Sequence, residues 1–405
     1  QTRIAAIELL GQSGNATHLT TLLEIAAQED AELAQTAMEA LAALPSSKVN
    51  AEIIERLSNT RGKPLLVLIK LVGQRRINTT AALLEALEQP DPSIRAAALV
   101  ALGETIGPDD LSALISHAIA PQSPSEADVA MQALRSAAVR MPDREACASQ
   151  LAEAMEQASL PTRVNLLKIL GAMGGPKALE TIAVQMKGGD DQLQDAGSRL
   201  LGAWMTADAA PVLLEQANSY SNEKYQIRAL RGYIRIARQF QLPIAERAEM
   251  CRNALAAATR PEERALVLQV LERYPNEKTL EVAIEAAKMP ELAEDSRATA
   301  LKIASQMNDK SAARALLAKI GLKPMEIEII KAEYGSGTTQ RDVTEVLRKF
   351  ARDVPAIELP SSYNQLFGDP TPGTVKQLKV QYRLNGKEGT AVFTENDKIV
   401  LPMPK

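Results

Sequence analysis

Aromatic residues are scarce in this chain. Phe, Tyr and Trp make up 3% of its 405 residues, whereas hydrophobic residues as a whole make up 46%. A globular α/β enzyme of this length would normally use more aromatic side chains to fill a thick core. A core built from Ala and Leu suits thin layers of helices that approach each other closely, so the composition favours a helical protein.

Histidine and cysteine are almost absent as well. The two histidines are His18 and His117, and the two cysteines, Cys147 and Cys251, are far apart. This excludes a disulfide framework, and no Asp, Glu, His or Cys cluster has metal-ligand spacing. Both cysteines fall in helical stretches, where small buried cysteines are common. We therefore expect no catalytic residues, no metal and no cofactor.

The chain also lacks a surplus of positive charge and a long apolar run. Its 46 basic and 50 acidic residues give a net charge of −4, which argues against a nucleic-acid partner. The longest apolar candidate, 64–73, is interrupted by Lys70, so no transmembrane segment is predicted. Because the chain starts at Gln1 and not at Met, we expect a preceding segment. A removed signal peptide would place the protein in the periplasm or outside the cell, and the cytoplasm is the alternative.

What the chain does contain is a helical-hairpin pattern, clearest in DPSIRAAALVALGETIG at 91–107. Asp91 and Pro92 predict a capped helix start, and Gly107 predicts a left-handed helix end. Apolar residues recur at helical spacing in this stretch and in the next: Ile94, Ala97, Ala98, Ala101, Leu102, then Leu111, Leu114, Ile115, Ala118, Ile119. Two such helices form a hairpin that needs neighbours to cover its apolar face.

Similar phrases recur along the chain at steps of thirty-odd residues. The equivalent positions are Leu10, Leu41, Val72, Leu102, Ala138, Leu170, Leu201, Ile236, Leu271 and Ala304. The longest step contains 120–128, which we interpret as a widened turn. The spacing predicts a mainly α fold over residues 1–322, a right-handed α-solenoid of about ten helical hairpins, in which each repeat packs on its neighbours.

The stretch from Asp91 to Ile115 resembles a HEAT-like repeat of the short variety also found in phycobilisome lyases, within the armadillo-type superfamily. Arg95 matches the arginine of that pattern, and comparable positions hold Arg3, Arg163, Arg228 and Arg297. The resemblance covers roughly residues 2–320. It implies a scaffold, an adaptor or an inhibitor, with an occasional lyase, and a concave face lined by the helix that carries the arginine.

The composition changes after Leu322, and residues 323–405 predict a small α+β or β-rich domain. We expect strands at 326–335 and 376–384, a short helix at 342–351, and two more strands at 389–394 and 397–402. Asn385-Gly386 predicts a two-residue hairpin turn. The order of motifs resembles a C-terminal module of mitochondrial DnaJ-like co-chaperones and of exported bacterial repeat proteins, which implies a binding role.

Three glycine-containing stretches are interpreted as turns. GAMGGPK at 171–177 lacks the order of a phosphate-binding loop, and YGSGTT at 334–339 lacks the third glycine of a dinucleotide fingerprint. The Gly and Pro residues of 368–373 are typical of turns, and a ligand-binding loop is the alternative interpretation.

One basic stripe stands out from this background. Arg228, Arg231, Arg235 and Arg238 share one face of a predicted helix, and Tyr225 and Tyr233 are close enough in sequence to stack beside their guanidinium groups. Such a stripe suits an acidic peptide, an acidic glycan or a lipid headgroup. The alternative is a solvated face that pairs with acidic residues of the next repeat.

Together these patterns predict a non-catalytic interaction scaffold that presents a concave helical groove to a protein or peptide. Two alternatives stay open: a glycan- or envelope-binding component of an exported protein, and a lyase-like accessory enzyme.

Overall fold

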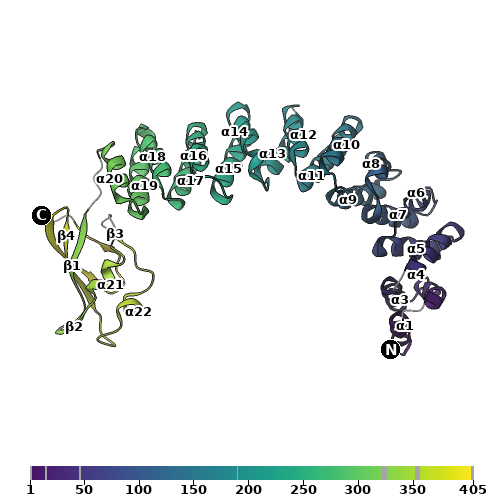
Figure 1. Ribbon diagram of the computed structural model, residues 1–405, viewed down its shortest axis with the longest axis horizontal. Coiled ribbons are helices and arrows are strands. Elements are labelled where there is room, and N and C mark those ends of the chain that lie inside the picture. Colours follow the sequence, from purple (N-terminus) through teal and green to yellow (C-terminus); the bar gives the residue numbers. More distant parts are fainter. Residues whose placement is uncertain are drawn as a thin grey trace. The chain divides into compact units, whose positions relative to one another are not determined.

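The computed structural model describes residues 2–13, 16–44, 47–188, 190–321, 326–351 and 356–402. The chain divides into two compact units, residues 1–209 and residues 210–405. The described residues are mainly helical, with a small antiparallel sheet near the C-terminus, as the sequence predicts (Figure 1).

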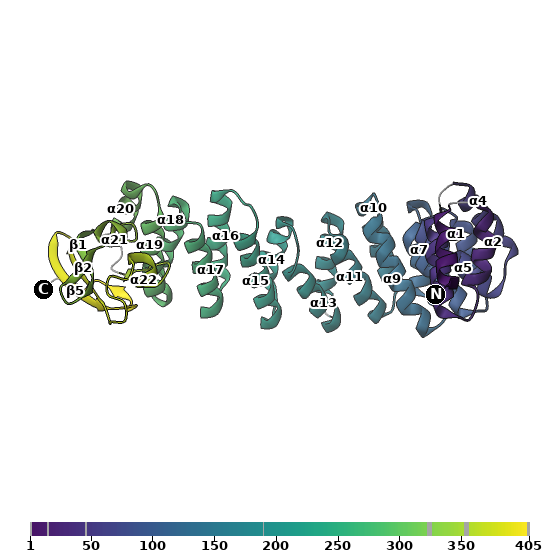
Figure 2. The ribbon, with the colours of Figure 1, turned by 90° about the horizontal axis from the view of Figure 1, so that it is seen from below.

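The first unit consists of helices in two layers, which Figures 1 and 2 show from two sides. One layer contains α1 (Thr2–Gln12), α3 (Ala31–Ala43), α5 (Gly62–Arg75), α7 (Pro92–Thr105), α9 (Pro124–Arg140), α11 (Leu160–Met173) and α13 (Asp191–Gly202). The other layer contains α2 (Leu19–Ala26), α4 (Ser47–Asn59), α6 (Thr80–Ala86), α8 (Leu111–Ile119), α10 (Arg144–Gln157) and α12 (Pro176–Lys187). We call these the first-helix layer and the second-helix layer, because each hairpin contributes its first helix to one and its second helix to the other.

Successive helices of the first layer touch at small residues. A Cβ added to Gly103 of α7 would lie 2.9 Å from both the Cα and the carbonyl oxygen of Ala133 in α9. Gly73 of α5 approaches Ala101 of α7 in the same way, with a virtual Cβ 3.1 Å from its Cα. Two of the equivalent repeat positions, Val72 and Leu102, are therefore followed by a glycine at which neighbouring helices come into backbone contact.

The start of α7 agrees with the sequence prediction, and its end does not. Asp91 caps the helix by accepting a hydrogen bond from the Ser93 amide at 2.8 Å, and Pro92 occupies the first turn. Gly107, however, has an extended backbone with φ −93° and not a left-handed one. The next residue is Pro108, which disfavours helical backbone in the residue before it and explains the extended conformation.

The longest repeat step arises inside a helix and not in a turn. Four residues, 120–123, separate α8 from α9, whereas five, 87–91, separate α6 from α7. The additional residues extend α9, which has 17 residues against 14 in α7. The predicted widened turn at 120–128 is therefore wrong.

Arginines connect successive repeats of the first unit. The Arg95 guanidinium donates to a Glu126 carboxylate oxygen at the start of α9 and to the carbonyls of Gln89 and Pro90 in the preceding turn. Arg75 lies in the last turn of α5. Its guanidinium donates, at 2.7–3.0 Å, to the carbonyls of Leu41 and Ala42 in the last turn of α3 and to that of Leu44 just after it. These bonds satisfy carbonyl groups that a helix end leaves without a partner in its own helix.

The second unit begins with further helices. They are α14 (Ala210–Ser219), α15 (Glu223–Gln239), α16 (Ile244–Ala257), α17 (Pro261–Arg273), α18 (Glu277–Ala286), α19 (Ala293–Gln306) and α20 (Lys310–Ala318). Among the described residues, the ten positions proposed as equivalent in the repeats fall one each in the ten odd-numbered helices α1 to α19. Nine of them are buried, and Leu10 is half-buried, which confirms the repeat spacing.

The strand-rich region follows α20. Its elements are β1 (Ile327–Ser336), β2 (Thr339–Asp342), α21 (Thr344–Arg348), β3 (Ala356–Ile357), α22 (Tyr363–Phe367), β4 (Gln377–Leu384), β5 (Lys387–Thr394) and β6 (Ile399–Val400). Four strands form an antiparallel sheet in the order β2-β1-β4-β5, and β3 pairs with β6. The boundary proposed at 322/323 lies outside the described residues and stays a prediction.

The alternation predicted for β4 is confirmed. Leu378, Val380, Tyr382 and Leu384 are each at most 1% exposed and pack on one side of the sheet. Asn385 and Gly386 form the two-residue turn to β5, both with positive φ as a type I′ turn requires.

The three glycine-containing stretches lie at turns. Gly174 and Gly175 separate α11 from α12, Gly337 lies between β1 and β2, and Gly368 and Gly373 have positive φ. In the last of these stretches the Asp369 carboxylate pairs with the buried Lys376 ammonium at 3.1 Å.

Candidate functional site

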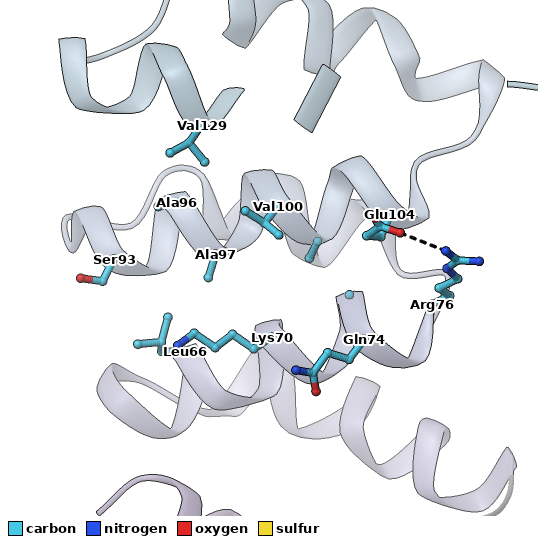
Figure 3. A pocket seen from close by; sticks show the side chains of 12 residues that line it. Leu66, Lys70, Gln74, Arg76, Ser93, Ala96, Ala97, Val100, Glu104 and Val129 are labelled. Carbon is cyan, nitrogen blue, oxygen red and sulfur yellow. Dashed lines mark hydrogen bonds and ion pairs between the residues drawn. The ribbon is translucent and has the colours of Figure 1, made fainter. Parts of the chain in front are cut away.

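A groove runs along the exposed side of the first-helix layer in residues 1–209. Its first compartment has a volume of about 740 Å³ and lies over α5, α7 and the start of α9 (Figure 3). Leu66 of α5, Ala97 and Val100 of α7, and Val129 of α9 supply apolar wall. Val100 is 56% exposed, although the other face of α7 is in the core.

The apolar wall results from the small side chains of α7. Ala97, expected in the core from its helical spacing, is only half-buried and lines the groove. Ala98 and Leu102, on the other side of the same helix, are fully buried. The apolar stripe of α7 is therefore wider than packing requires, and its additional edge faces solvent.

An ion pair lies at one end of this compartment. Arg76 follows α5 with a left-handed backbone, φ 50°, and its guanidinium lies 3.2 Å from the Glu104 carboxylate of α7 (Figure 3). Both side chains also line a second compartment of about 1030 Å³ over α9 and α11. The two compartments therefore adjoin at the Arg76–Glu104 pair and form one groove across four helices.

The second compartment is mixed in character. Met131 and Val139 contribute apolar surface, and Val139 is 45% exposed. Arg135 and Lys168 are exposed cations on α9 and α11. Polar side chains line the rest of the second compartment, which therefore suits a ligand with both apolar and polar groups.

Cations outnumber anions along the groove. The charged lining residues are Lys70, Arg76, Arg135, Arg140 and Lys168 against Glu104 and Asp128. Arg140 donates to the carbonyls of Gly103 and Ile106, and Lys168 donates to Asn165. Lys70 and Arg135 are exposed and make no ion pair with any residue that the structure describes. The groove thus has a net positive lining within a chain of net charge −4.

The predicted arginine stripe lies on α15 in the second unit. Arg231 pairs with Glu263 of α17 at 2.8 Å, and Glu263 is only 1% exposed. Arg235 lies over the Phe240 ring, with 5.6 Å to its centroid, and burial lowers the pKa of its guanidinium. Arg238 is exposed, and Arg228 is half-buried. At least Arg231 therefore contributes to contact between repeats.

The tyrosines of that prediction are in the core of the second unit. Tyr225 and Tyr233 are each 3% exposed, so neither ring lies open beside the arginines on the surface. Burial raises the pKa of the Tyr233 hydroxyl. Gln226 donates to the Tyr220 carbonyl six residues back, as Arg95 does to the Gln89 carbonyl. By its contacts, Gln226 is therefore the residue that corresponds to Arg95, two positions before Arg228.

Both cysteines are buried thiols. Burial raises the pKa of Cys147 to about 11 and that of Cys251 to about 12, so both are protonated at neutral pH. Within the described part of the chain, no group of three or more His, Cys, Asp and Glu side chains is arranged to hold a metal ion. In that same part, no helix combines the length and the apolar character needed to cross a membrane.

The sequence predicts a groove along the arginine-bearing helices, but it does not identify the residues that line this one. Ala97 follows the helical spacing of the core, so the pattern does not mark it as exposed, whereas Val100 lies outside that stripe and has no predicted role. The one available signal is Lys70, which interrupts the apolar run 64–73 on the helix face beside the groove.

Comparisons with known proteins give no family. No protein-family model and no curated protein matches the chain. A homology model of the full-length AP-3 complex is similar with 13% identity and a TM-score of 0.40, covering 78% of this chain and 67% of that one. Human deoxyhypusine hydroxylase is similar with 18% identity and a TM-score of 0.26, covering 65% of this chain and 98% of that one. Both TM-scores are below 0.5, so neither similarity supports a conclusion about this chain.

Proposed function

We propose that this protein is a non-catalytic interaction scaffold and that the groove over α5, α7, α9 and α11 holds a segment of a partner protein. The observation that carries the proposal is the exposed apolar wall. Val100 and Val139 lie at 56% and 45% exposure in adjoining compartments of one groove, where a partner side chain could bury them.

The size of the groove supports a polypeptide ligand. Helices packed in one layer lie about 8–10 Å apart, so four of them span roughly 25–30 Å. An extended chain covers this length with about eight or nine residues. The two compartments together are also larger than the ~300–1,000 Å³ usual for a small-molecule pocket.

The composition of the lining favours binding over catalysis. Neither compartment is lined by a histidine or a cysteine, the residues that most often act as base or nucleophile. The Glu104 carboxylate pairs with the Arg76 guanidinium at 3.2 Å, and the Arg140 guanidinium donates hydrogen bonds to two carbonyl groups. The charged groups are thus arranged as surface contacts and not around one reacting position.

Two valines of equal exposure make a matched test. Val100 lines the groove, and Val184 on α12 of the second-helix layer is also 56% exposed. A photo-crosslinking residue at position 100 of the full chain, expressed in its own cells, would identify the partner by mass spectrometry. The purified partner is then titrated against the wild type, Val100→Glu and Val184→Glu.

The proposal predicts that Val100→Glu weakens binding at least about tenfold, because it places a charge against a buried apolar contact. Val184→Glu should leave the affinity unchanged. Equal affinities for both variants, with circular dichroism showing both folded, would overturn the proposal.

A further inference from the structure

We infer that the segment held by this groove is acidic at one end and apolar at the other. This inference rests on the proposed function, because it specifies the chemistry of the same site. The two compartments differ in composition, and cations outnumber anions along them.

The apolar end lies over α5 and α7. Leu66, Ala97, Val100 and Val129 surround a space in which Lys70 is the only side chain with an unpaired charge among the residues drawn in Figure 3. A leucine or phenylalanine side chain placed there would cover Val100 and leave the Lys70 ammonium at the rim. Burial of apolar surface stabilises a complex, so this end supplies affinity.

The cationic end lies over α9 and α11. Arg135 has no ion-pair partner among the described residues, and the Lys168 ammonium has only the Asn165 amide oxygen, at 3.1 Å. Asp128 is the one carboxylate in this compartment apart from Glu104, which Arg76 already neutralises. A guanidinium binds a carboxylate with two parallel hydrogen bonds, so glutamate or aspartate is the complementary side chain here.

The separation of the two ends sets the spacing in the ligand. The α7 wall and the α9–α11 cations are separated by one to two interhelical distances, roughly 10–20 Å. An extended chain covers that distance with about three to six residues. The expected ligand therefore has an apolar side chain and, about three to six residues away, one or two carboxylates.

The charge pattern alone would also suit a nucleic acid, but the apolar wall does not. A phosphate backbone gains nothing from covering Val100, Ala97 and Leu66, whereas an apolar side chain of a protein does. The chain as a whole is acidic, so the positive groove is local and does not reflect a generally basic surface.

A displayed library of random peptides of about twelve residues, selected on the full-length protein, tests the inference without a known partner. The enriched peptides are synthesised and their affinities measured by fluorescence anisotropy at low and high salt. Four proteins are compared: the wild type, Val100→Glu, Arg135→Glu, and Lys48→Glu as the control. Lys48 is exposed on α4 in the other layer and makes no ion pair with a described residue.

The inference predicts acidic peptides with an apolar anchor. Their affinity should fall roughly five- to tenfold with Arg135→Glu and with high salt, which screens exposed charges, and should not change with Lys48→Glu. Val100→Glu should weaken them further.

Other outcomes separate the inference from the proposed function. Neutral or basic peptides whose binding depends on Val100 would overturn the acidic specificity and leave the groove as a binding site. A selection without any peptide that depends on Val100 would overturn both. Binding of a single-stranded oligonucleotide that Arg135→Glu abolishes and Val100→Glu leaves unchanged would replace the inferred partner with a nucleic acid.

Discussion

The Nε atom of Arg95 lies 2.6 Å from a carboxylate oxygen of Glu126, although the two residues belong to successive repeats 31 positions apart. Both side chains are largely buried, at 14% and 8% exposure. Removing one partner from a buried ion pair leaves a charge without compensation and costs about 3 kcal/mol or more. We expect Glu126→Ala to lower the free energy of unfolding by about 3 kcal/mol, measured by urea denaturation.

The control for this change is an exposed pair in the same unit. Arg76 and Glu104 are 69% and 37% exposed, and such pairs contribute under about 1 kcal/mol. Glu104→Ala should therefore shift the unfolding midpoint much less than Glu126→Ala. Equal shifts would mean that the buried pair does not stabilise the contact between α7 and α9.

Backbone contact between α7 and α9 gives a second prediction. Gly103→Ala should destabilise by about 1–3 kcal/mol, even though alanine is the better helix former, because the new Cβ meets the Ala133 backbone at 2.9 Å. Gly107→Ala serves as the comparison, since no atom lies within 4 Å of its added Cβ and its φ of −93° suits alanine. Thermal melts of both variants measure the difference, and a Gly103→Ala variant as stable as the wild type would contradict the close contact.

The repeat architecture could be predicted from the sequence because its cause is local. A helix needs apolar residues at helical spacing, and a repeat needs them again at the next hairpin, so Leu102 and Leu170 mark their helices without any tertiary information. The same is true of the Asp91 cap and of the alternation in β4 around Tyr382.

The candidate site could not be predicted in the same way. Whether Ala97 faces the core or the solvent depends on how far the neighbouring helices cover α7, and spacing within α7 does not reveal that. For Arg231 the sequence leaves two roles open, a ligand-binding stripe and a face that pairs with acidic residues of the next repeat, and Glu263, 32 positions away, fits the second. Arg95 and Glu126 make a similar pair at a separation of 31 positions.

The buried thiols predict a dependence on alkaline pH. Burial raises the pKa of Cys147 to about 11 and that of Cys251 to about 12 in the folded protein, whereas an unfolded cysteine titrates near 8.5. The folded state holds these protons more tightly, so their contribution to stability is complete below about pH 8.5 and is lost as pH rises through the folded values. Urea midpoints should fall between pH 8 and pH 11, and less steeply in a Cys147→Ala/Cys251→Ala variant.

Chemical modification checks the same burial independently. A thiol reagent at pH 8 should leave both cysteines of the native protein unmodified for hours and modify both at once in denaturant, because the reagent attacks the exposed thiolate. Burial also raises the pKa of Tyr363, to about 12, so part of the alkaline loss should persist in the variant without cysteines. Rapid modification of the native protein would show that these helices open readily.

Substitutions of two arginines on α15 distinguish a packing role from a ligand-binding role. Arg231→Glu places a carboxylate against Glu263, which is 1% exposed and also lies 3.3 Å from Arg260. Like charges at this distance repel, so we expect a clear loss of stability, seen as a lower melting temperature. Arg238→Glu changes an exposed residue on the same helix and should leave the melting temperature within about one degree, as most surface substitutions do. If Arg231→Glu melted like the wild type and only lost affinity for an anionic ligand such as heparin at low salt, the stripe would be a binding surface and the contact with α17 incidental.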